Sequence, residues 1–430
     1  MNRIILIGNG FDLAHQLKTS YKHFLADYWS NVIQEIRKSN IWKKYENDEI
    51  IIDKSPGNSI TENTLDSLKK SITAVGGSLE YKNIFIKFIT EKDLENWVDI
   101  EDEYYKLLVN SYHIDGKRRN RDRYGFRDKY PIEKLNNDFE RVKTLLKDYL
   151  LKEESNFNRS KNGLSHFINS VNRKVFSSFQ FRDFTEKYKE QRANLEYESI
   201  VNELTEFRLK NKLFSEYDND AKLNLLSQLS SASDPQKTMK NILLSDEANR
   251  YFDAVPDKTL FLSFNYTSTH YSYDSPQGFK SLYTDKITEI EYIDIHGTLE
   301  HQEGNPIIFG FGDELDEEYL EIEKLNDNRY LKNIKSINYL KTDNYKKLLK
   351  FISEKEYQIF IFGHSCGVSD RTLLNTLFEN DNCVSIKFFY YKVNDDINNY
   401  SDIVSNISRN FNNKASMRDK VVNFTYCEPI

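Results

Sequence analysis

Hydrophobic positions form two kinds of pattern along the chain, and the first is a continuous run near the N-terminus. Residues 3–7 are almost entirely apolar and end at glycines, which is typical of a buried parallel strand. A helix is expected directly after this strand, over 11–17. A second helix is expected over 21–37, where apolar residues recur on one face.

The second pattern fills the middle of the chain, from about residue 40 to 250. Apolar residues recur three and four positions apart with Lys and Glu between them, which predicts helices. The expected helices are 60–75, 92–110, 132–151, 195–210 and 221–229. The segment 113–130, which contains the basic run Lys117–Arg123, is expected to be a solvated loop.

Short apolar runs return after residue 255 and alternate with helical patterns. The expected strands are 259–264, 287–295, 306–311, 357–362, 384–391 and 421–426, and the expected helices are 345–353, 371–380 and 401–411. This alternation favours an α/β fold with a parallel sheet. The simplest organisation is a nucleotide-binding core of residues 1–30 plus 250–430, interrupted by a mainly helical insert at 31–249.

Composition narrows the classes of protein that fit. The 60 basic and 67 acidic residues give a net charge of −7, which disfavours a globally cationic nucleic-acid binder. The three cysteines form no CxxC pair and no cluster with histidine, so neither a metal site nor a disulfide framework is expected. No apolar stretch approaches the ~20 residues of a membrane span. We therefore expect a cytoplasmic protein without a membrane partner.

The first candidate site is the glycine turn Gly8-Asn9-Gly10, where the first strand meets a helix. Glycines let a phosphate approach the backbone, and a helix start offers free N–H groups. Leu13 stands where a Rossmann fingerprint has its third glycine, which disfavours an NAD dehydrogenase. A tight turn that holds no ligand remains an equal alternative.

A second glycine turn lies at residues 363–367, which read Gly-His-Ser-Cys-Gly. This string matches the nucleophile elbow of serine hydrolases. Those enzymes place their histidine after the serine, whereas no histidine follows His364 in this chain. A serine hydrolase is therefore disfavoured, and Ser365 or Asp370 is expected to cap the next helix or face a ligand.

Two more strand ends carry polar groups that suit a ligand. Asn265 follows one expected strand and His296 follows the next. In an open parallel sheet, ligands bind at the carboxyl ends of the strands. We therefore expect four strand ends, carrying Gly8 to Asp12, Asn265, His296 and Gly363 to Asp370, to meet at one crevice.

Several blocks together resemble the AbiH family, a bacterial family linked to abortive infection against bacteriophage. The matching strings are GNGFDLAH at 8–15, LKTSY at 17–21, FNYT at 264–267, IHG at 295–297 and GHS at 363–365 with Asp370. The block 97–101 also resembles a family motif. The resemblance implies a role in phage defence. It leaves open whether a phage-derived trigger or a second copy of this chain is a partner.

The same blocks resemble, more remotely, sirtuin-like NAD-binding domains. That resemblance implies a sirtuin-like, Rossmann-type parallel sheet and catalytic roles for Asn265 and His296. The zinc-binding cysteines of deacetylating sirtuins are absent, so NAD-hydrolysing defence domains are the closer analogue. NAD or a related nucleotide is thus the expected substrate, and no cofactor is required.

The resemblance also implies a role for each candidate residue. His296 would act as general base, and Asn265 would orient ribose or water. The expected binding residues are Gly8, Asn9, Gly10, Phe11, Asp12, Thr267, Gly363, Ser365 and Asp370. Trp97 and Glu101 share a helix face, and Glu101 could be functional or part of a structural salt bridge.

Two other functions stay open at this point. The domain could be a non-catalytic nucleotide-binding sensor, whose helical insert detects a phage product. It could also be a metal-dependent nuclease, if Asp12, Asp99 and Glu101 meet in space.

Overall fold

The computed structural model describes residues 1–39, 43–92, 97–115, 130–209, 220–273, 288–299, 305–314, 316–394 and 397–430. The basic run Lys117–Arg123 lies outside the described residues, as do the side chains of Trp97 and Asp99.

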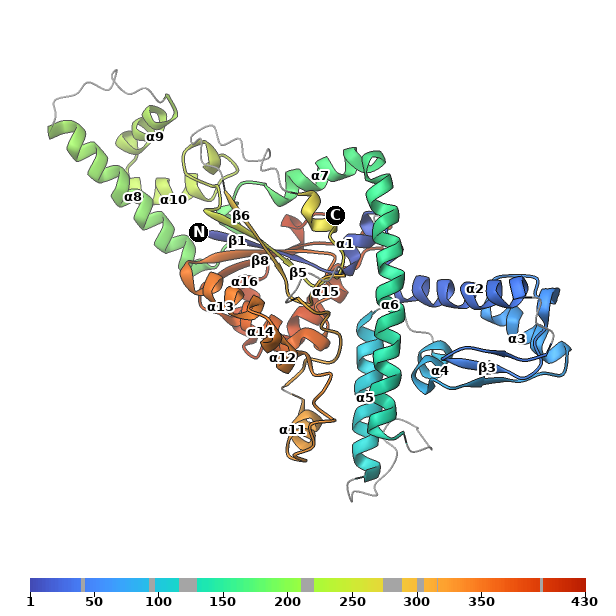
Figure 1. Cartoon of the computed structure of the whole chain (residues 1–430). Helices are drawn as coiled ribbons and strands as arrows, with labels where there is room; N and C mark the ends of the chain where they lie inside the picture. Colours follow the sequence, from blue (N-terminus) through green and yellow to red (C-terminus); the bar gives the residue numbers. More distant parts are fainter. Residues whose placement is uncertain are drawn as a thin grey trace.

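A five-stranded parallel sheet forms the centre of the molecule (Figure 1). Its strands are β1 (Asn2–Ile7), β5 (Lys258–Ser263), β6 (Glu289–Asp294), β7 (Tyr357–Phe362) and β8 (Cys383–Phe389). Strand β1 pairs with β5 on one side and with β7 on the other, both in parallel. The prediction that the first strand joins the strands of the C-terminal region is therefore confirmed.

The strand order places a ligand-binding edge near β1. The order is β6-β5-β1-β7-β8, so the chain adds two strands on one side of β1 and then two on the other. In doubly wound sheets a crevice opens at such a reversal, beyond the carboxyl ends of the strands. The α/β class with a parallel sheet is confirmed, whereas a sirtuin-specific fold stays a prediction.

Alternate side chains of the strands enter two different cores. Ile4 and Leu6 of β1 pack with helices of the C-terminal region, while Ile5 and Ile7 pack on the opposite face against Val171 and Val175. The face that carries Ile4 and Leu6 is covered by α13 (Asn344–Glu354), α14 (Arg371–Glu379), α15 (Tyr400–Arg409) and α16 (Lys414–Lys420). The face that carries Ile5 and Ile7 is covered by α1 (Asn9–Ala14) and α7 (Ser165–Val175).

A buried arginine joins the expected insert to the sheet. The guanidinium of Arg3 donates hydrogen bonds to the carbonyls of Val175 (3.0 Å), the last residue of α7, and Ser177 (2.6 Å), just beyond it. Its flat face lies over the rings of Phe179 and Phe360. Residues 165–179 thus cover the sheet itself, and the predicted domain boundaries, 1–30 plus 250–430 against 31–249, stay a prediction.

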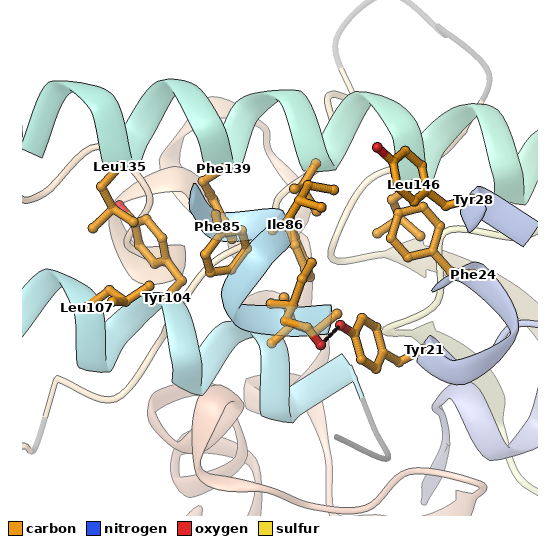
Figure 2. Packing of buried hydrophobic residues seen from close by; sticks show 14 of the residues in the cluster. Tyr21, Phe24, Tyr28, Phe85, Ile86, Tyr104, Leu107, Leu135, Phe139 and Leu146 are labelled. Atoms are coloured by element: carbon orange, nitrogen blue, oxygen red, sulfur yellow. Dashed lines mark hydrogen bonds between the residues drawn. The ribbon is translucent and has the colours of Figure 1, made fainter. Parts of the chain in front are cut away.

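The other part of the middle region forms a second large core. It contains α2 (Tyr21–Ser39), α3 (Leu65–Ala74), α4 (Ile84–Glu91), α5 (Trp97–Asp115), α6 (Ile132–Ser160) and a small antiparallel sheet of β2 (Tyr45–Glu46), β3 (Ile50–Ile52) and β4 (Leu79–Tyr81). Helices α5 and α6 run side by side, with the Tyr104 and Phe139 rings stacked 4.0 Å apart between them (Figure 2). Tyr21 of α2 closes this core by donating a hydrogen bond to the Ile89 carbonyl (2.5 Å).

The remaining helices are α8 (Glu186–Leu209), α9 (Asp220–Ser231), α10 (Pro235–Leu243), α11 (Glu317–Glu323) and α12 (Lys335–Asn338). Each of the five helices expected in the middle region overlaps an observed one. None of the helices in the described ranges is long and apolar enough to cross a membrane.

Two expected strands are wrong. Residues 306–311 make only an isolated bridge from Phe311 to Ile334, and residues 421–426 make only one from Val421 to Ile386. Their apolar side chains serve the cores instead, with Phe309 and Phe311 in the core of the middle region. The small sheet β2–β4 was not expected, because its strands are two or three residues long.

Candidate functional site

Two glycine turns, which follow the carboxyl ends of β1 and β7, pack directly against each other. The Gly10 N–H donates to the Gly363 carbonyl at 2.8 Å, and Gly363 adopts a φ of +67°. A Cβ on Gly8 would lie 2.5 Å from the Cα of His364, and one on Gly363 would lie 2.0 Å from the Phe11 nitrogen. Glycine is therefore needed in both turns for backbone contact, whether or not a ligand binds.

This contact corrects the expectation that the backbone N–H groups of the first glycine turn are free to bind a phosphate. The Gly8 N–H donates to the Phe362 carbonyl (3.1 Å), so the amide hydrogens of Gly8 and Gly10 are both used within the protein. Phe11 is completely buried in the core beneath the sheet, with its ring against His15 and Tyr273. The side chain of Phe11 thus stabilises the fold and does not face a ligand.

A cavity of about 560 Å³ opens beside these turns, beyond the carboxyl ends of β1, β5, β6 and β7. Its lining includes all of the other expected site residues: Gly8, Asn9, Gly10, Asp12, Asn265, Thr267, His296, Gly363, Ser365 and Asp370. The four strand ends therefore meet at one cavity, which is within the size range of small-molecule sites.

A buried network of charges occupies one part of the cavity lining. Lys335 lies between two carboxylates, with its Nζ 2.7 Å from Glu101 Oε2 and 2.8 Å from Asp370 Oδ1. Asp370 also approaches two histidines, His296 through Oδ1 (3.2 Å) and His364 through Oδ2 (3.6 Å). All five side chains are buried. Such clusters of interacting titratable groups are typical of functional sites.

The pKa values of this network are shifted in opposite directions. Burial alone would raise the pKa of Asp370, but Lys335 and His296 outweigh it and hold that pKa well below its usual range. For Glu101, burial dominates over the attraction of Lys335 and raises the pKa to about 7. Asp370 is therefore ionised at neutral pH, while Glu101 titrates there.

His296 is oriented by contacts at both ring nitrogens. Nδ1 lies 3.1 Å from the Phe264 carbonyl, and Nε2 lies 3.1 Å from the Tyr339 hydroxyl. Burial, reinforced by Lys335, lowers the pKa of His296. The neutral ring suited to these contacts donates from Nδ1 to Phe264, which leaves the lone pair on Nε2. In this tautomer Nε2 accepts the hydrogen bond of the Tyr339 hydroxyl and lies next to the Asp370 carboxylate.

Asn265 and Thr267 connect the loop after β5 to the first glycine turn. The Asn265 side-chain NH₂ donates to the Gly8 carbonyl (3.0 Å), and the Thr267 hydroxyl donates to Asp12 Oδ2 (2.6 Å). Burial raises the pKa of Asp12 to about 6, although the Thr267 hydrogen bond opposes this. These residues hold two loops of the cavity together, so each has a structural role besides any contact with a ligand.

The serine of the second turn lacks the surroundings of a nucleophile. Ser365 is exposed, and none of the described residues hydrogen-bonds its hydroxyl. His364 Nδ1 accepts from the backbone N–H of Cys366 (2.9 Å), so that nitrogen cannot serve as the base for Ser365. The strained φ of +55° is at Cys366, one residue beyond the serine. This geometry argues against a serine-hydrolase elbow.

Lys335, Tyr339 and His364 contribute to the site without having been assigned to it from the sequence. Lys335 and Tyr339 lie in a polar stretch between expected strands, where no spacing or motif marks them. Glu101 was noted for its helix face and as a candidate metal carboxylate, and the structure places it in the cavity lining in contact with Lys335. Asp370, expected to cap the next helix or face a ligand, lies in the cavity lining beside His296.

Comparison with known proteins supplies the family. The model of the bacteriophage abortive infection family AbiH matches residues 4–392. This chain belongs to the AbiH family. The match covers the cavity residues of all four strand ends and nearly the whole chain, which links the AbiH protein described here to abortive infection. No curated protein and no solved structure matches the chain.

Proposed function

We propose that the cavity binds a nucleotide and hydrolyses its N-glycosidic bond, with NAD as substrate, as the effector step of abortive infection in the cytoplasm. The observation that carries this proposal is the presence of His296, Asn265 and Asp370 in the lining of one cavity. Family membership supports the setting in phage defence. The resemblance of the strand-end blocks to NAD-hydrolysing domains supports the choice of substrate.

The proposed reaction needs only the nucleotide and water. The oxygen of water bonds to the ribose carbon C1′, and the bond from C1′ to nicotinamide breaks with its electron pair leaving on nicotinamide. His296 Nε2 takes the proton of the water. Asp370 Oδ1, 3.2 Å from Nε2, stabilises the imidazolium that forms. Ionised Asp370 also favours the positive charge that develops on the ribose.

The other residues would bind and orient the substrate. Asn265 lies in the lining between the glycine turn and His296, where an amide can hold a ribose hydroxyl or the water. Asp12 and Thr267 line the same cavity and form a polar pair for ribose. Ser365 contributes a hydroxyl for binding and does not attack.

The test is nicotinamide release from NAD by the purified protein, with His296→Ala and Asn265→Ala as variants. We expect each variant to lose ~10²–10⁴-fold in rate, because each removes a group used in the transition state. Protection of bacteria against phage should be lost with both. Ser365→Ala is the comparison variant, since it shortens an exposed side chain of the same cavity that binds and does not attack, and its loss in rate should be much smaller.

Folding must be checked for Asn265→Ala by thermal unfolding, since that variant also loses the contact with Gly8. If Ser365→Ala is inactive while His296→Ala hydrolyses NAD normally, the mechanism is wrong. If His296→Ala protects bacteria normally, the cavity acts as a nucleotide sensor and not as an enzyme.

The metal-dependent nuclease gains no support from the described residues. Within the described part of the chain, no group of three or more His, Cys, Asp or Glu side chains could hold a metal ion. The side chain of Asp99, which that alternative needs, lies outside the described residues.

A further inference from the structure

A continuous chain of buried charges links helix α5 to the proposed general base. Glu101 of α5 contacts Lys335 at 2.7 Å, Lys335 contacts Asp370 at 2.8 Å, and Asp370 contacts His296 at 3.2 Å. These four residues come from α5, α12, the 3₁₀ turn Val368–Asp370 and the loop after β6. The connection therefore runs from the helical middle region into the strand-end cavity.

From this geometry we infer that Glu101 is a positioning residue for the reaction, which fixes the Asp370 carboxylate against His296 by holding Lys335. The inference rests on the proposed function, because it assigns a role within the same site. It adds that the helical region takes part in the reaction, because His296 and Asp370 keep their relative orientation only while α5 stays in place beside the sheet.

Burial makes the position of Lys335 depend on both carboxylates. The side chain is 1% exposed, so its charge is stabilised by Glu101 and Asp370 in place of water. Burial alone would lower the pKa of Lys335, and the two carboxylates more than offset this. Without Glu101, the ammonium would interact with Asp370 alone, which weakens the attraction of Asp370 for the imidazolium form of His296.

Glu101 itself is held at both oxygens. Oε2 contacts Lys335, and Oε1 accepts a hydrogen bond from the Gly310 N–H (3.3 Å). The charged and titratable groups that interact with it are Lys335, Asp370, Tyr266 and Tyr339. Its chain of direct contacts to the base runs through Lys335 and Asp370. This arrangement is that of a group that orients other groups, because Lys335 and Asp370 stand between Glu101 and His296.

The test compares Glu101→Gln with Glu103→Gln in the full-length protein. Glutamine keeps the size of the side chain and removes its charge. Glu103 is a matched control, because it is a buried carboxylate on the same helix that pairs with Lys92 and Lys106 away from the cavity. We expect Glu101→Gln to lose about 10- to 100-fold in kcat with KM nearly unchanged, and Glu103→Gln to retain the wild-type kcat.

The pH profile separates positioning from mere stability. Since burial raises the pKa of Glu101 to about 7, Glu101 becomes ionised and pairs with Lys335 as the pH rises through neutrality. The wild-type kcat should therefore rise through pH 7, and this step should be absent in Glu101→Gln but present in Glu103→Gln. A Glu101→Gln protein with the wild-type kcat and pH step would overturn the inference.

A second measurement does not depend on NAD hydrolysis. Labelled histidine gives NMR signals whose titration reports the pKa of His296, assigned by comparison with His296→Ala. We expect the titration of His296 to move to lower pH in Glu101→Gln and to stay unchanged in Glu103→Gln. If the wild type fails to release nicotinamide but this shift occurs, the proposed reaction is wrong and the coupling stands. If nicotinamide is released and no shift occurs, the coupling is wrong.

Discussion

The contact between the two glycine turns makes a strong prediction for Gly363→Ala. Gly363 has a φ of +67°, which costs a residue with a Cβ about 1–2 kcal/mol. The new Cβ would also lie 2.0 Å from the Phe11 nitrogen and 2.4 Å from the Gly10 carbonyl carbon. Separating the turns costs about 1–3 kcal/mol more, as in other overpacked sites. We therefore expect Gly363→Ala to lose about 2–5 kcal/mol of stability.

The assay is equilibrium unfolding in urea, followed by circular dichroism, with Gly163→Ala as control. No heavy atom lies within 4 Å of a Cβ built on Gly163, so that variant should stay within about 1 kcal/mol of the wild type. Gly363→Asn separates the two terms, because asparagine tolerates a positive φ but still carries the clashing Cβ. It should lose only the packing part. Equal urea midpoints for Gly363→Ala and Gly163→Ala would refute the close contact of the turns.

Two further predictions concern buried charges. Arg3→Met should cost about 2–4 kcal/mol in urea unfolding, because the carbonyls of Val175 and Ser177 lose a buried donor; a loss below about 0.5 kcal/mol would contradict the role given to Arg3. For Asp12, burial raises the pKa from 3.8 to about 6, so the folded state holds a proton that the unfolded state has released between these values. Wild-type stability should therefore fall by roughly 2.4 kcal/mol relative to Asp12→Asn as pH rises from 4 to 7, and parallel stability curves for the two proteins would show that Asp12 is not buried as described.

The sheet could be predicted from the sequence because its strands are local features. Each of β1, β5 and β7 is a short apolar run that ends at a glycine or polar residue, and such runs need no distant partner to be recognised. Residues 306–311 have a similar composition, yet they form no strand. Phe309 stacks on Phe139 and Phe311 on Tyr105, so their apolar character serves packing between helices.

The site could be predicted only where it follows the strand ends. Asn265 and His296 were found because the carboxyl ends of parallel strands converge, and both line the cavity. Lys335 could not be found in this way, because its importance comes from two carboxylates more than 30 and 200 positions away. Phe11 shows the opposite error: it lies inside a motif of site residues, but the helix turns its side chain into the core.

The central place of β1 in the sheet has a consequence for how the protein is made. The strand is synthesised first, but its neighbours β5 and β7 begin at residues 258 and 357. At 5–20 residues per second, β1 would wait on the order of ten to fifty seconds for its first partner. The cavity needs β7 and its glycine turn, and residues as late as Asn399, Ile403 and Ile430 also line it, so it forms only when nearly all of these 430 residues have been made. Partial chains would therefore lack the cavity, and any ligand of this site could bind only after residues 357–430 have folded onto β1.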